Sequence, residues 1–126
     1  MTLQADIKTA LSAVALQAVV GTRVYPLELP AQATYPAITY RVVDSVPLSS
    51  SHDGADATTK PRVQISIWSK VALQTEQIAV LVIAAFKTHV GERNLEVIDY
   101  GRTDQEPSEN AFVWLMDLRW PRRYDG

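Results

Sequence analysis

The chain has 126 residues, of which 47% are hydrophobic and 21% are charged, and its formal net charge is −2. We expect residues 1–126 to form one globular domain with its own hydrophobic core. The absence of cysteine excludes disulfides, thiolate metal ligands and a cysteine nucleophile. The small negative charge argues against a nucleic-acid-binding protein, which needs a basic surface to neutralise phosphates.

No segment predicts secretion or a membrane span. The N-terminal stretch contains Asp6 and Lys8 and lacks the basic region followed by an apolar block that defines a signal peptide. The longest apolar run, Ile78 to Phe86, has nine residues, whereas a helix that crosses a bilayer needs about 20. We therefore expect a soluble protein that is made in a cytoplasm and has no membrane partner.

Residues 3–13 predict a helix, because apolar residues recur there at spacings of three and four. A second short helical turn follows, and Gly21 suits its C-terminus, where a left-handed residue is favoured. Residues 22–26 predict a short extended piece. Three prolines in residues 26–36 then indicate an irregular connection.

Two strands are predicted next, at residues 37–46 and 62–68, because apolar and polar residues alternate in both. The second strand has one core face and one polar face, and Trp68 falls on the polar face. Residues 48–60 are small and polar and predict a long loop between the two strands.

Residues 72–90 predict a long helix, with Ser69 as a candidate N-cap and Gly91 as its stop. Nine consecutive apolar residues leave no polar face over its middle turns, so the helix must be covered on more than one side. In the simpler interpretation, the first helix covers Val80, Ile83 and Ala84 within one subunit. In the alternative, a second copy of the protein covers them.

The chain closes with a strand at residues 95–101, an acidic loop at 103–110 and a strand at 111–120. The last strand is apolar on both faces, which is typical of the centre of a sheet or of an interface. Helix, strand, strand, helix, strand, strand indicates an α+β fold. We expect an antiparallel sheet of about four strands, packed by two main helices on one face.

No pattern indicates catalysis, a cofactor or a metal. His52, Asp53 and Asp56 form the only group that resembles a ligand or acid–base cluster, but their spacing fits no ligand motif. The five glycines are isolated, which excludes a phosphate-binding glycine loop. His89 lies near a predicted helix C-terminus, where it interacts favourably with the helix dipole. We expect a protein without catalytic, cofactor-binding or metal sites.

The surplus of apolar and aromatic residues instead predicts an oligomer, whose interface resembles a core cut in half. The C-terminal run mixes arginine with aromatic residues, which anchor interfaces. Docking on an acidic partner is favoured there over a solvated tail or a nucleic-acid-binding strip. The predicted interface residues are Trp68, Val113, Leu115, Arg119, Trp120, Arg122, Arg123 and Tyr124.

Four segments, in order, resemble the phage tail completion proteins, the small proteins that join tail to head in long-tailed phages. Residues 16–26 (LQAVVGTRVYP) resemble the family's ALVG-x-R-I/V-Y-P signature. Residues 35–40 (YPAITY) are similar to its LP-x-hydrophobic-x-Y strand, and residues 62–69 (RVQISIWS) to its R-V-Q-I-D-V-W strand. Residues 118–120 (LRW) fit its closing pattern. Ser66 departs from the family, in which an acidic residue is common at that position, and so does the proline-rich connection at 26–36.

This resemblance implies a non-enzymatic virion protein at the head–tail interface. It implies a ring of identical subunits, hexameric in the related tail terminators, that sits on the last ring of the tail tube and ends its growth. The implied partners are other copies of the chain, the major tail tube protein and a head-completion or connector protein. DNA passes through the lumen of such a ring without specific binding.

Within such a ring, the loop at residues 48–60 has a candidate role in assembly, and an ordinary solvated loop is the alternative. The residues proposed for this assembly loop are Ser50, Ser51, His52, Asp53, Gly54 and Asp56. Other functions remain open on the sequence alone: a head-completion (neck) or minor tail protein, or a small α+β dimeric enzyme or ligand-binding module. The enzyme or ligand-binding module would have a pocket with convergent polar groups.

Overall fold

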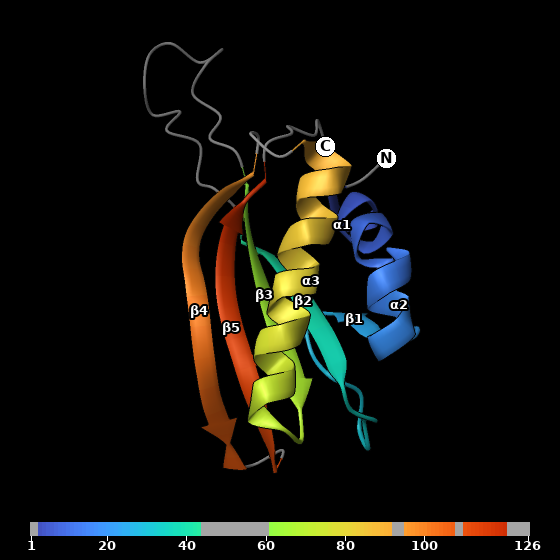
Figure 1. The fold of residues 1–126 in the computed structure, drawn as a ribbon, viewed down its shortest axis with the longest axis vertical. Coiled ribbons are helices and arrows are strands. Elements are labelled where there is room, and N and C mark those ends of the chain that lie inside the picture. Colours follow the sequence, from blue (N-terminus) through green and yellow to red (C-terminus); the bar gives the residue numbers. More distant parts are fainter. Residues whose placement is uncertain (1–2, 44–60, 92–94, 108–109, 121–126) are drawn as a thin grey trace.

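The computed structural model describes residues 3–43, 61–91, 95–107 and 110–120. These residues form three helices and a five-stranded sheet (Figure 1). In chain order the elements are α1 (Leu3–Leu11), α2 (Val14–Val20), β1 (Val24–Pro26), β2 (Ala37–Val43), β3 (Arg62–Ser69), α3 (Ala72–Val90), β4 (Glu96–Glu106) and β5 (Ala111–Arg119).

The strands lie in the order β1-β2-β3-β5-β4. β1 runs parallel to β2, and the other neighbours are antiparallel. The α+β class is confirmed, but the prediction of about four antiparallel strands is corrected to five with one parallel pair. The strand absent from the prediction is β1, which was predicted only as a short extended piece at residues 22–26. It has only three residues, so it contains too little alternation to be recognised without its pairing partner.

The predicted end of β4 is also wrong. The strand continues through residues 103–106, which the sequence pattern assigned to an acidic loop. β4 is an edge strand with charged side chains along most of its length, so it lacks the alternation of a half-buried strand. Its pairing with β5 shifts register twice, between Val97 and Asp99 and between Asp99 and Arg102.

The helices follow the predictions more closely. α3 has the predicted bounds, and Gly21 and Gly91 end α2 and α3 with φ of 59° and 98°. Ser69 is not the N-cap of α3: that position is Val71, whose backbone N–H donates to Ser69 Oγ at 3.0 Å. The first predicted helix is α1, which ends two residues earlier than predicted, and the second predicted helical turn is α2.

The core lies between the helices and one face of the sheet. Val63, Ile65 and Ile67 of β3 are fully buried in this layer together with the inner face of α3. β5 lies between β3 and β4, which confirms its central place in the sheet. The prediction that the outer apolar residues of α3 are covered within the subunit is correct for Ile83, which is buried, and wrong for Val80, which is 54% exposed. Ala84 is exposed as well.

Among the described residues, no single helix is long and apolar enough to cross a membrane. The bent pair α1 and α2, with 79° between the helices, passes the same length and composition test when taken together.

Candidate functional site: surfaces for assembly

The face of the sheet that points away from the helices carries a regular grid of side chains. Strand pairing aligns Arg41, Gln64, Asp117 and Asp99 in one row across β2, β3, β5 and β4. A neighbouring row contains Leu115, which is 50% exposed between Ser66 and Arg102. This row places one predicted interface residue on the outside of the subunit.

Trp68 lies on the same face and is partly buried. Its Nε1 donates a hydrogen bond to Thr39 Oγ1 at 3.1 Å, across the β2–β3 pair. A hollow of about 390 Å³ opens beside it, with Leu27, Leu29 and Arg41 among its lining residues. No group of three or more His, Asp or Glu side chains that could hold a metal occurs within the described part of the chain.

Trp120 and Val113 lie inside the subunit. Trp120 is fully buried, its ring packs edge-to-face on Phe86 at a centroid distance of 5.1 Å, and its backbone N–H donates to the carbonyl of Pro61 at 2.8 Å. The side chain of Trp120 is therefore a core group that fixes the end of β5. Val113 is also buried.

The remaining predicted residues divide into two groups. Arg119 is partly exposed and its Nε lies 4.0 Å from Glu96 Oε2, a distant contact between two surface groups. Outside the described residues lie Arg122, Arg123 and Tyr124 of the predicted interface, and Ser50, Ser51, His52, Asp53, Gly54 and Asp56 of the predicted assembly loop.

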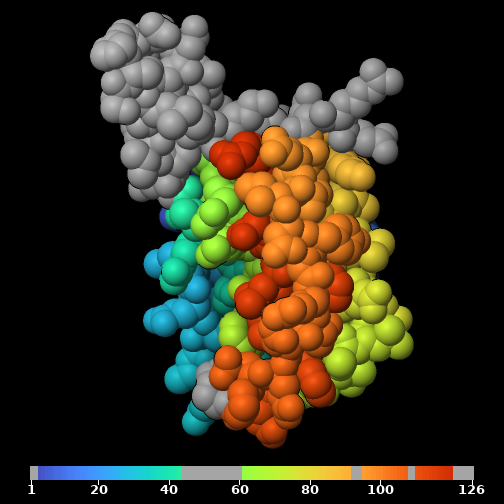
Figure 2. Space-filling model, turned by 90° about the vertical axis from the view of Figure 1, so that its left-hand side faces the viewer, coloured from blue at the N-terminus to red at the C-terminus, as the bar shows by residue number. Residues whose placement is uncertain are grey.

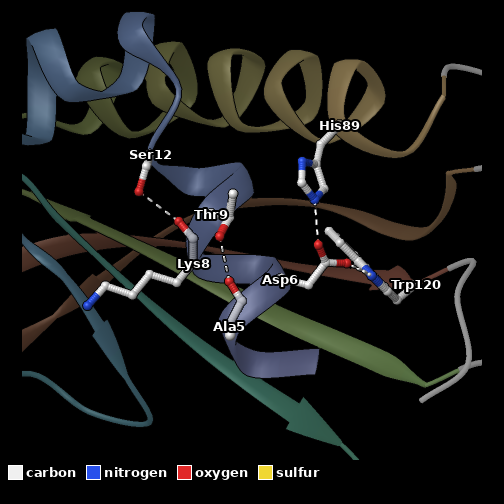
Figure 3. Close-up of polar contacts among 7 residues, drawn as sticks. All are labelled: Ala5, Asp6, Lys8, Thr9, Ser12, His89 and Trp120. Atoms are coloured by element: carbon white, nitrogen blue, oxygen red, sulfur yellow. Dashed lines mark hydrogen bonds and ion pairs between the residues drawn. The ribbon is translucent and has the colours of Figure 1, made fainter. Parts of the chain in front are cut away.

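A buried polar cluster joins α1, α3 and the end of β5. Asp6 is 1% exposed, and its carboxylate accepts hydrogen bonds from Trp120 Nε1 at 3.1 Å and contacts His89 Nε2 at 2.6 Å (Figure 3). The prediction that His89 interacts with the helix dipole does not include this contact with Asp6. The sequence indicates that Asp6 lies on the apolar face of α1, because Asp6 follows Leu3 by three residues and precedes Ala10 by four.

The contacts of this cluster indicate a structural role. The hydroxyls of Thr9 in α1 and of Ser12, directly after α1, donate to the carbonyls of Ala5 and Lys8 one turn earlier (Figure 3). They are therefore engaged by the backbone of α1. The Asp6–His89–Trp120 contacts tie three elements together that are far apart in sequence.

Comparison with known families decides the class of this protein. The family model described as tail completion protein gp17 matches residues 5–121, which include every helix and strand except the first two residues of α1. The chain belongs to the tail completion protein family. It therefore has a role in phage tail assembly, is a virion component and comes from a structural family. No curated protein sequence matched it.

The helix side of this tail completion protein carries a second candidate surface. A groove of about 510 Å³ runs between the α1–α2 junction and α3. Small residues dominate its lining, among them Ala13, Ala15 and Ala84. Val14, at the start of α2, is 85% exposed, and Val80 projects from the outer face of α3. The simpler interpretation of the sequence placed Val80 and Ala84 in intrachain contacts, and the alternative placed them against a second copy. The sequence could not decide between the two, because the exposure of an apolar helix face depends on where the neighbouring helices end.

Proposed function

We propose that this tail completion protein forms a ring that ends the growing tail tube and joins the tail to the head. The observation that carries the proposal is the membership of nearly the whole chain in a tail completion family. Half-exposed apolar side chains on both the sheet and the helix sides, including Leu115 and Val80, support it, since an assembly subunit needs adhesive surfaces beyond its core.

The proposed partners are other copies of the chain, in a hexameric ring, the major tail tube protein and a head-completion or connector protein. DNA would pass through the lumen without specific contacts.

Electron microscopy of phage tails made without this protein tests the proposal. We expect overlong tails, or tails that fail to join heads, and restoration when the wild-type chain is supplied. Tails of normal length that join heads would refute it. Tails of normal length with heads that lose their DNA would instead indicate a head-completion protein.

A further inference from the structure

Two exposed apolar surfaces lie on opposite sides of the subunit. We define the edge surface by Ile98 and Tyr100 of β4, and the helix surface by Val14, Val80 and Ala84. Figure 1 shows β4 at one side of the molecule and α1–α2 at the other, and Figure 2 shows that β4 runs along its side from end to end. A head-to-tail contact between copies requires two different patches that face in different directions.

The edge surface is held rigid. Val97 pairs with Leu118 and Arg102 pairs with Leu115, so β4 advances five residues where β5 advances three, and the extra residues of β4 form a bulge. Gly101 sits against β5 so closely that a Cβ would lie 1.9 Å from the carbonyl oxygen of Leu115. The N–H of Gly101 donates to Asp99 Oδ1 at 2.9 Å. The conformation of the bulge is therefore specified by its own contacts.

The side chain of Tyr100 is also oriented by its surroundings. Trp114 Nε1 donates to the carbonyl of Tyr100 at 2.9 Å, and the two rings pack edge-to-face at a centroid distance of 6.0 Å. Tyr100 nevertheless stays nearly half exposed, as does Ile98. Exposed apolar groups fixed in advance lose little conformational entropy on binding, which favours a docking surface.

The helix surface offers a matching shape. Its groove is lined largely by alanines, threonines and serine, so the backbones leave room for large side chains from outside. Val14 and Val80 are large apolar side chains at the surface beside this groove. The edge surface presents Ile98 and Tyr100, which are the kind of group that such a groove receives.

The charges of the two surfaces are complementary. β4 contains four carboxylates, Glu96, Asp99, Asp104 and Glu106, against Arg102 alone. The helix layer carries Lys8 of α1 and Lys87 of α3, against one exposed carboxylate, Glu76, one turn before Val80, and the buried Asp6. An acidic strand would thus approach a weakly basic helix layer, which orients the two copies.

We propose that the edge surface of one copy docks on the helix surface of the next. The contact is heterologous, so each copy uses one surface toward each neighbour, and repetition of the contact closes a ring or extends a filament. This inference rests on the proposed ring and names the surfaces that build it.

Single-cysteine variants test the contact directly, because the chain has no cysteine of its own. A mixture of I98C and V80C, treated with a short bismaleimide at millimolar protein, should give cross-linked dimers, about tenfold more than either variant alone. L27C is the control for I98C, since Leu27 is an apolar side chain elsewhere that is 57% exposed, against 42% for Ile98. Absence of the 98–80 product, or equal yield from L27C with V80C, would overturn the proposal.

Charge substitutions give a second, independent readout. I98E and V80E should each weaken self-association of the folded subunit about tenfold or more, because each buries a charge in an apolar contact. Mixed together, the two variants should form a one-to-one dimer and nothing larger, since each retains one intact surface. L27E is the control and should associate like the wild type.

The results separate the surfaces from the function. Ring assembly by I98E or V80E alone, or a mixture that stays monomeric, would refute the proposed contact. If both variants restore normal tails to a phage that lacks the protein, the ring function stands and these surfaces are wrong. Tails of normal length made in the absence of the protein would refute the function itself.

Discussion

Asp6→Ala tests whether the buried polar cluster is a structural unit. Asp6 is almost completely buried and contacts His89 Nε2 at 2.6 Å and Trp120 Nε1 at 3.1 Å. A hydrogen bond to a charged group contributes about 1.5–3 kcal/mol, and a buried donor left without a partner costs about 1–3 kcal/mol. The substitution removes the acceptor of the buried indole N–H and the partner of the imidazole.

We therefore expect Asp6→Ala to lower the free energy of unfolding by about 3–4 kcal/mol, a large part of the roughly 5–15 kcal/mol available to a domain. Urea unfolding followed by circular dichroism and tryptophan fluorescence measures the loss. The melting temperature should fall by about 10 °C or more. Glu76→Ala is the matched control, because Glu76 is an exposed helical carboxylate, and should change stability by less than about 0.5 kcal/mol.

The cluster also predicts coupling between its members. His89→Ala should lower the free energy of unfolding less than Asp6→Ala does, since the His89 side chain is 24% exposed and its removal leaves no buried indole N–H unpaired. The double variant should lose less stability than the sum of the two single variants. Additive losses, or a loss below about 1 kcal/mol for Asp6→Ala, would show that Asp6 does not tie α1 to α3 and β5.

Three further substitutions probe the sheet and its packing. Gly101→Ala should lower the free energy of unfolding by about 3 kcal/mol, because φ is +93° and the new Cβ meets the backbone of Leu115; a melting curve like the wild type's would contradict this. Thr75→Val should cost about 1 kcal/mol in urea unfolding, because it breaks the 2.8 Å hydroxyl contact with Thr103 that joins α3 to β4. Burial raises the pKa of Tyr40 above 10.0, so the tyrosine of the unfolded chain ionises first and wild-type stability should fall as pH rises beyond about 10. Tyr40→Phe should flatten that alkaline decline, and an unchanged pH profile would show that Tyr40 does not cause it.

The parts of the fold that sequence reasoning predicts share one property, which is strong local periodicity. β3 alternates without interruption, and α3 combines a continuous apolar run with a glycine stop, so both have the predicted bounds to within a residue. β1 and the end of β4 lack that signal. β1 exists because its three residues pair with Ile38, Thr39 and Tyr40, and the end of β4 exists because β5 offers it a partner.

The candidate surfaces were harder to predict, since burial is a property of the assembled fold. Leu115 and Trp120 are both large and apolar, and both occur in or beside β5. Trp120 packs on Phe86 and is fully buried, while Leu115 faces the side of the sheet that no described helix covers. Composition marks both as interface candidates, and only the packing of α1 and α3 over one face distinguishes them.

This distinction moves the proposed interface from the C-terminal aromatic residues to the edge of the sheet. An unprotected edge strand exposes unpaired backbone groups, and charged side chains and bulges commonly shield it from uncontrolled pairing. β4 has both devices, yet its bulge also holds Ile98 and Tyr100 at the surface. Charges that block strand-to-strand pairing while leaving an apolar bulge accessible favour docking of the edge against helices. An edge of this kind suits a subunit that must join its neighbours in one orientation and must not polymerise through its sheet.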